Sequence, residues 1–244
     1  MKVYSLFLGS LATALLLWGA GCRSTPAIPP ENARRIKRYW ALYLRRSPEW
    51  EKARAEWTAM GAAERRALAD LLILDVKNRT GLTELDALGK PHAAWIRPVK
   101  ELERLGEDAR EPLLQALRRV RDEASVPAYA EALASVSRFQ DLSPFFEKKK
   151  GGETGRFQSR LILALAHLQD PRAVDLLVSV ARDPAYDWRV RARASEMLGR
   201  TGKEDRRKVI AALNAALEKE KDGFVAQKMK EALKALQRSE GGRR

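Results

Sequence analysis

The chain has 244 residues, a formal net charge of +14 at pH 7 and a single cysteine. One cysteine excludes an internal disulfide, so the fold must be stabilised by packing. A net charge of this size bears on solubility and on association with other molecules, and it does not determine a fold.

The first 21 residues have the features of an export signal. Lys2 supplies a positive start, an apolar run extends from Leu6 to Trp18, and residues 19–21 are small, as before a cleavage point. The apolar run is shorter than the roughly 20 residues that a membrane-spanning helix needs. We therefore predict a signal peptide over residues 1–21.

The sequence Gly-Ala-Gly-Cys at residues 19–22 resembles the lipobox of bacterial lipoproteins, although the family usually has leucine where this chain has Gly19. The resemblance implies that Cys22 is lipidated and becomes the new N-terminus, with no other cofactor. It also implies a membrane anchor without a transmembrane helix. Arg23, where some lipoproteins have aspartate, implies sorting to the outer membrane, facing the periplasm. The alternative is a plain secretory signal with a cysteine near the cut.

Residues 22–30 are predicted to be the lipidated cysteine and a short tether. Ser24 to Pro30 contains three prolines in seven residues. Such a composition favours an extended spacer of roughly 3 Å per residue, which would hold the folded part close to the membrane.

A helix is predicted from Glu31 to Arg46. One face carries apolar and aromatic side chains and the opposite face carries arginines and lysines. The apolar face consists of Ile36, Trp40, Tyr43 and Leu44. The helix either lies on anionic lipid next to the anchor, or it is an ordinary first helix of a solenoid, packed by its aromatic side chains and solvated by its arginines.

Residues 31–107 as a whole are predicted to be an irregular helical region. Ser47-Pro48-Glu49 is a helix start, with a capping serine, a proline in the first turn and an acid at the positive end of the helix dipole. Further helices are predicted around Leu68 to Val76 and within Gly89 to Gly106. No alternating run typical of a strand occurs, so the fold class is all-α.

The stretch from Asp170 to Leu236 aligns with itself at an offset of 35 residues. Asp187, for example, falls on Asp222, and Leu198 on Leu233. Within each unit, apolar residues at i, i+3, i+4 and i+7 predict two helices separated by a turn. One hairpin cannot bury both apolar stripes, so such units are expected to stack into a solenoid.

The second helix of this unit resembles that of a short HEAT repeat. The family pattern is aspartate, then Val-Arg, a small residue and Leu-Gly, and this chain has Asp187-Trp-Arg-Val-Arg-Ala-Arg-Ala194 followed by Met197-Leu198-Gly199. The second copy departs from the pattern, with Ala226 in the place of Arg191, as is typical of a terminal repeat. The resemblance implies a HEAT-like α-solenoid in which Arg191 ties neighbouring units together.

About four such units are predicted over residues 108–237. The hairpin that begins near Asp108 has its second helix at Val126 to Val136, and the next begins near Asp141. Residues 238–244 are predicted to be a disordered basic tail.

No residue pattern indicates catalysis or a metal site. His92 and His167 are the only histidines, and neither has a second ligand at i+4. No HExxH, glycine-rich phosphate loop or GxSxG occurs. We therefore expect a protein that is not an enzyme and that holds no metal.

A basic stripe is predicted across the second helices, on the side opposite their apolar residues. Its members are Arg156, Arg160, Arg189, Arg193, Arg200 and Lys228. The stripe could bind lipid head groups, lipopolysaccharide phosphates or an acidic protein. The alternative is a solubilising face without a ligand.

These features together favour an envelope lipoprotein whose solenoid is a non-catalytic scaffold for a partner protein. Other HEAT-like proteins bind nucleic acid, including DNA glycosylases, and others are bilin lyases. Both classes act away from the envelope, so the export signal argues against them unless it is misread. We expect no nucleic-acid partner.

Overall fold

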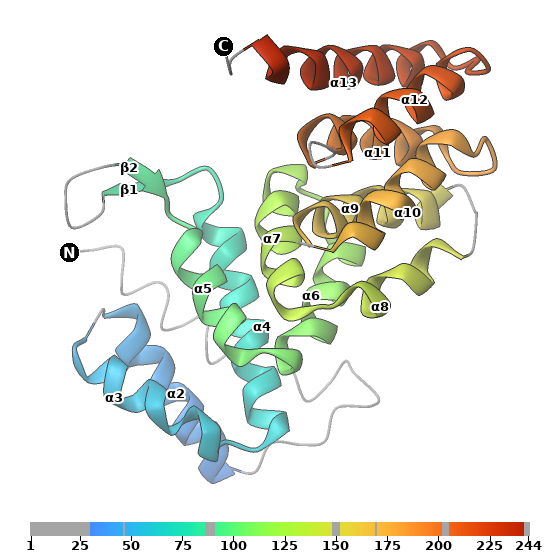
Figure 1. Ribbon diagram of the computed structural model, residues 1–244. Helices are drawn as coiled ribbons and strands as arrows, with labels where there is room; N and C mark the ends of the chain where they lie inside the picture. The colour runs from blue at the N-terminus through green and yellow to red at the C-terminus, as the bar shows by residue number, and fades with distance from the viewer. Residues whose placement is uncertain are drawn as a thin grey trace. The chain divides into compact units, whose positions relative to one another are not determined.

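A computed structural model of the protein describes residues 30–45, 47–85, 91–147, 152–168, 170–201 and 205–241 (Figure 1). These residues form twelve α-helices and one short two-stranded sheet, which confirms the all-α class. The signal peptide, Cys22 and most of the tether lie outside the described residues, so the predictions made for them stay predictions. No helix in the described ranges combines the length and the apolar character needed to cross a membrane.

The chain divides between Leu68 and Ala69 into two compact units. The described part of the first unit contains α2 (Pro30–Leu44), α3 (Glu49–Ala55), the short 3-10 helix η1 (Glu56–Ala59) and the start of α4 (Ala62–Arg79).

Aromatic side chains form the core of the first unit. Trp40 stacks on Tyr43 with the ring centroids 5.1 Å apart, and Trp50 of α3 meets Tyr43 edge-on at 5.3 Å. Ile36 and Tyr39 are also buried, and Leu44 is half-buried. The aromatic face of α2 therefore packs inside the protein, which favours the packed-helix alternative over a helix lying on lipid.

Polar contacts fix the helix starts of the first unit. The Ser47 hydroxyl accepts a hydrogen bond from the Glu49 N–H at 3.2 Å, although the N-cap residue of α3 is Pro48 and not the predicted Ser47. At the start of α4, buried Glu64 accepts from the Gly61 N–H at 2.8 Å and pairs with Arg35 of α2 at 2.8 Å. One carboxylate thus caps α4 and ties it to α2.

The second unit begins with the rest of α4 and with β1 (Thr83–Leu85), β2 (Pro91–Ala93) and α5 (Ile96–Leu105). The strands pair antiparallel, with Glu84 opposite His92. This sheet was not predicted from the sequence, because strands of three residues are too short to show an alternating pattern.

Helical hairpins make up the rest of the second unit, as the repeat pattern predicts. The first helices are α6 (Glu107–Arg119), α8 (Phe139–Leu142) with the 3-10 helix η3 (Ser143–Phe146), α10 (Pro171–Arg182) and α12 (Arg206–Leu217). The second helices are α7 (Val126–Val136), α9 (Gly152–His167), α11 (Trp188–Thr201) and α13 (Gly223–Gly241), and a short 3-10 helix, η2 (Glu123–Ser125), precedes α7.

The second helices form one layer in which α7 packs on α9, α9 on α11 and α11 on α13. The helices α6, α10 and α12 pack against their own partners, and α10 also packs against α12, so they form the other layer (Figure 1). Between the layers, Leu161, Leu198 and Val225 are fully buried. This is the stacked arrangement of a helical-repeat protein.

Two segments differ from the sequence predictions. The hairpin predicted to begin near Asp141 opens with the four-residue helix α8 and η3 instead of a full-length helix, because Ser143-Pro144 starts a tighter turn directly after Leu142. At the C-terminus, α13 continues to Gly241, so residues 238–241 are helical and were wrongly predicted as tail. Residues 242–244 lie outside the described residues.

Candidate binding face

Aspartate caps set the start of each second helix in the last two hairpins. The Asp187 carboxylate accepts from the Arg189 N–H at 2.9 Å, and the Asp222 carboxylate accepts from the Phe224 N–H, also at 2.9 Å. Each cap satisfies a backbone donor that the first helical turn leaves free. The same capping geometry therefore brings the residues after each aspartate to equivalent places in successive repeats.

Buried apolar residues fix the rotation of these helices. Val190 and Ala194 of α11 are fully buried, and so are Val225 and Met229 of α13. Residues one position before these core positions turn toward the surface of the helix layer. Arg189 and Arg193 of α11 therefore match Phe224 and Lys228 of α13.

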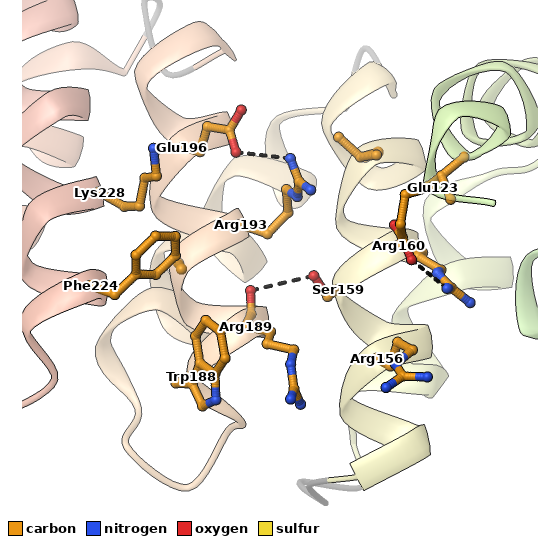
Figure 2. A pocket seen from close by; sticks show the side chains of 13 residues that line it. Glu123, Arg156, Ser159, Arg160, Trp188, Arg189, Arg193, Glu196, Phe224 and Lys228 are labelled. Atoms are coloured by element: carbon orange, nitrogen blue, oxygen red, sulfur yellow. Dashed lines mark hydrogen bonds and ion pairs between the residues drawn. The ribbon is translucent and has the colours of Figure 1, made fainter. Parts of the chain in front are cut away.

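A pocket of about 450 Å³ is lined mainly by the middle of α9, the first half of α11 and the start of α13 (Figure 2). Five of the six predicted basic-stripe residues line it: Arg156, Arg160, Arg189, Arg193 and Lys228. The structure thus brings these five together, as the repeat spacing predicts. Arg200 is exposed and is not among the lining residues, so it does not belong to this cluster.

Most cations of the pocket already have an acidic neighbour. Arg193 pairs with Glu196 at 2.9 Å and Lys228 with Glu231 at 2.7 Å, both within one helix. Arg189 lies 3.4 Å from its capping residue Asp187. Partly exposed pairs of this kind contribute about 0–1 kcal/mol, so these cations can exchange their partners for those of a bound molecule.

Arg160 differs from the other members of the stripe because it is buried. Its Nη1 donates to the Leu117 carbonyl oxygen at 3.0 Å and its Nη2 pairs with Glu123 at 2.5 Å. These contacts join α9 to the C-terminal end of α6 and to η2. Arg160 was predicted as a surface binding residue, and the structure corrects this: its guanidinium holds neighbouring elements together.

Two exposed aromatic residues complete the pocket. Trp188 is 41% exposed and Phe224 is 49% exposed, and their rings meet edge-on with centroids 5.5 Å apart. The Arg189 guanidinium lies 4.8 Å from the centre of the Trp188 ring, and the Lys228 ammonium 5.7 Å from that of Phe224. This pair was not predicted from the sequence, although Trp188 follows the capping Asp187 directly and Phe224 lies two residues after the capping Asp222.

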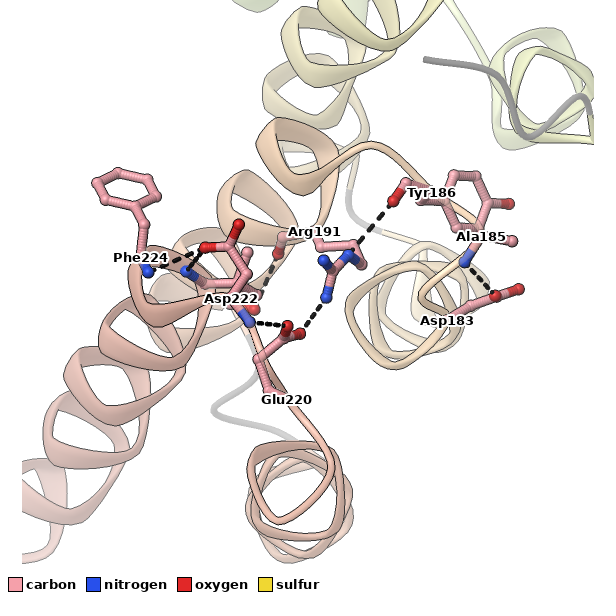
Figure 3. Close-up of polar contacts among 9 residues, drawn as sticks. Asp183, Ala185, Tyr186, Arg191, Glu220, Asp222 and Phe224 are labelled. Atoms are coloured by element: carbon pink, nitrogen blue, oxygen red, sulfur yellow. Dashed lines mark hydrogen bonds and ion pairs between the residues drawn. The ribbon is translucent and has the colours of Figure 1, made fainter.

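Arg191 lies on the other side of α11 and is buried. Its Nε donates to the Tyr186 carbonyl oxygen at 3.3 Å, and its Nη1 pairs with the Glu220 carboxylate (Figure 3). Glu220 also accepts from the Asp222 N–H at 2.8 Å, directly before α13. Arg191 therefore ties its own repeat to the next one, which confirms its predicted structural role.

The helix pairing, the aspartate caps and the arginine tie are those expected of HEAT repeats, and residues 151–234 match the family model described as HEAT repeats. These residues form a HEAT-repeat domain. No curated protein and no solved structure matches the chain. The domain contains α9 to α12 and most of α13, and with them most of the pocket. The predicted repeat region begins at residue 108, and its part before residue 151 lies outside the matched region, so the assignment of that part to HEAT repeats stays a prediction.

The two histidines lie outside the pocket. His92 is half-buried in β2, and His167 is exposed in the last turn of α9. Across the described ranges, no three His, Cys, Asp or Glu side chains gather as a metal site would require.

Proposed function

We propose that the protein is a non-catalytic scaffold, anchored in the bacterial envelope by lipid on Cys22, whose HEAT-repeat domain binds a partner protein. The binding surface is the basic–aromatic face, which we define as Arg156, Trp188, Arg189, Arg193, Phe224 and Lys228. The observation that carries the proposal is that three consecutive second helices present these cations and the exposed aromatic pair in one pocket.

The composition of the face favours a protein partner. Binding hot spots in protein interfaces are enriched in tryptophan, tyrosine and arginine, and large exposed apolar residues mark such sites. The pocket volume of about 450 Å³ would admit a small molecule. Small-molecule pockets, however, are lined mostly by apolar side chains with few polar groups. Here four of the six residues of the face are cationic, which suits a polar protein surface better.

The envelope location and the anchor rest on the residues before the described part of the chain. The basic start, the short apolar run and Cys22 directly after Gly-Ala-Gly support an exported and lipidated protein. Each buried CH₂ group of an acyl chain would add about 0.8 kcal/mol to membrane binding, so two or three chains would make release negligible. We place the protein at the outer membrane, facing the periplasm.

The binding face is tested by affinity capture from detergent extracts of the envelope. We expect wild-type protein to retain a partner protein that Trp188→Ala/Phe224→Ala loses. The matched control is Leu74→Ala/Leu82→Ala, which removes two exposed apolar side chains elsewhere in the second unit. The proposal is wrong if the aromatic variant and the control retain the same proteins in the same amounts.

The anchor is tested by mass spectrometry of the mature N-terminus. We expect a diacylated or triacylated Cys22, and a Cys22→Ala protein that no longer fractionates with membranes. An unmodified N-terminus that begins at another residue would exclude the anchor. With Met1 retained, the protein would be cytoplasmic and nucleic acid would have to be reconsidered as a partner.

A further inference from the structure

A second pocket adjoins the first and shares Arg156 and Arg160 with it. Its volume is about 930 Å³. Arg118, Arg119 and Arg121 line it from the C-terminal end of α6 and the segment that follows. Among the described residues that line it, none is acidic, in contrast to the first pocket. We call this second pocket the arginine pocket.

The two pockets together form one positively charged groove. Eight basic side chains line it against two acidic ones, Glu123 and Glu196. Clefts lined by charges of one sign focus the electrostatic field and raise the local concentration and the association rate of oppositely charged partners. The groove is therefore complementary to an anionic molecule that extends across both pockets.

A cation lies near the centre of each aromatic ring that lines the groove. The Arg118 guanidinium lies 4.9 Å from the ring centre of Phe157 and 5.6 Å from that of Phe145. Arg189 and Lys228 lie over Trp188 and Phe224 in the same way. Proteins that bind single-stranded nucleic acid need open ring faces on which bases stack. Here each of the four rings has a cation near it, and the rings also meet edge-on in pairs, Trp188 with Phe224 and Phe145 with Phe157.

The concave shape of the groove favours a protein segment over a membrane surface. Basic residues that bind anionic lipid extend long side chains toward the head groups. Here the exposed residues Arg118, Arg119, Arg121 and Arg156 and the partly exposed residues Arg189 and Arg193 line pockets of about 930 and 450 Å³. A narrow chain can enter such pockets, whereas a flat bilayer surface meets only their rims.

We propose that the groove binds an extended acidic segment of the partner protein. Carboxylates of the segment pair with Arg156, Arg189 and Arg193 and with the arginine pocket. An apolar side chain of the segment packs against Trp188 and Phe224. This inference rests on the proposed function, because it specifies the chemistry of the partner that the scaffold binds.

Fluorescence anisotropy with the detergent-solubilised full chain tests this inference. The probe is a short labelled peptide of glutamates with one central tryptophan, and its control is the same peptide with every glutamate replaced by glutamine. We expect the glutamate peptide to bind at least about tenfold more tightly than the glutamine peptide. Its binding should weaken with added salt, because salt screens the charges. Equal binding of the two peptides, or no binding of either, would overturn the inference.

A pair of charge-reversal variants locates the binding. The double variant Arg156→Glu/Arg193→Glu should bind the glutamate peptide at least about tenfold more weakly than the wild type, because each change replaces an attraction by a repulsion. Arg207→Glu/Lys219→Glu changes the net charge equally at exposed positions away from both pockets and should leave binding within about twofold. Circular dichroism checks that both variants fold. Equal effects of the two variants would refute a site in the groove.

Two further probes identify competing ligands. An oligothymidylate and vesicles of phosphatidylcholine with phosphatidylglycerol should bind more weakly than the glutamate peptide. If either probe binds more strongly than the glutamate peptide, and this binding is lost in Arg156→Glu/Arg193→Glu, then the groove binds nucleic acid or lipid and not an acidic protein segment. If envelope capture depends on Trp188 and Phe224 while the glutamate peptide does not bind, the inference fails and the proposed function stands. If the peptide binds and nothing is captured, the proposed function fails.

Discussion

At the scale of single residues, burial decides what each arginine of the HEAT-repeat domain does. Arg160 and Arg191 are buried, and their guanidinium groups are bonded to carbonyl oxygens and carboxylates of neighbouring elements. Arg189 and Arg193 remain partly exposed beside the pocket. Arg191 differs from the others already in its place along α11. Arg160, Arg189 and Arg193, however, each directly precede a buried core residue, so the burial of Arg160 arises from its neighbouring elements and not from the pattern along its helix.

Replacing Arg191 is expected to destabilise the protein strongly. Arg191→Met keeps the length of the side chain but leaves the buried Glu220 carboxylate without its cation. Breaking a buried pair from one side typically costs about 3–5 kcal/mol in the free energy of unfolding. Urea unfolding measures the loss. The double variant Arg191→Met/Glu220→Gln should lose less than the sum of the single variants, and strict additivity would contradict the ion pair.

The stability of the first unit is expected to depend on pH because of Tyr39. Burial raises the pKa of the Tyr39 phenol to about 12, and its hydrogen bond to Glu56, 2.6 Å long, acts in the same direction. The folded pKa lies above the ordinary value of 10.0. The neutral phenol therefore contributes stability below pH 10, and this contribution is lost as the pH rises through about 12.

The matching variant is Tyr39→Phe, which cannot ionise. Between pH 10 and 12 the free energy of unfolding of the wild type should fall more steeply than that of the variant, by at most about 2–3 kcal/mol at about 1.4 kcal/mol per pKa unit. Urea midpoints at several pH values give the two slopes. Parallel pH profiles would show that Tyr39 does not have the raised pKa.

At the scale of elements, α11 and α13 approach each other closely at Gly199. A Cβ atom placed on Gly199 would lie 2.9 Å from the Cα and 3.1 Å from the Cβ of Ala232. This contact gives a physical reason for the glycine that the HEAT pattern places after leucine. The equivalent residue in the last repeat is Lys234, which is exposed because no further helix follows in the described chain.

Gly199→Val should force the two helices apart. Overpacking of a tight contact typically costs about 1–3 kcal/mol, and the Ala232 atoms nearest to Gly199 belong partly to the backbone, which cannot rotate away. Gly223→Ala is the control, since a Cβ there meets no atom within 4 Å. Thermal unfolding should show a lowered Tm for Gly199→Val and little change for Gly223→Ala. A Gly199→Val protein as stable as the wild type would contradict the close packing.

The elements that the sequence predicted well are those with strong local signals. Asp170-Pro171 starts α10 and Asp187 caps α11, and each is followed by a regular apolar stripe. The sheet of β1 and β2 has no such signal, because a three-residue strand is defined by its partner strand and not by its own pattern. The extension of α13 to Gly241 was missed for a similar reason, since its last turns follow the apolar stripe and are polar.

At the scale of the whole molecule, the repeat spacing placed most of the candidate site. Residues separated by one repeat occupy equivalent positions, so Arg160, Arg193 and Lys228 fall in line across three helices. Arg200 was wrongly included because it lies two turns after Arg193, which displaces it roughly 10 Å along the helix. The arginine pocket could not be predicted, because Arg118 and Arg121 reach Arg156 only through packing of α6 against α9.

Photo-crosslinking in cells at the basic–aromatic face is the most direct test of the central claim, that this face of the HEAT-repeat domain binds a partner protein. A photoreactive phenylalanine analogue replaces Trp188, and a second protein carries it at Leu82, an exposed apolar position away from the pocket. We predict a discrete crosslinked protein from position 188 alone, rich in acidic residues at the crosslinked segment, and lost in Arg156→Glu/Arg193→Glu. No crosslink from position 188, or the same products from both positions, would contradict the account.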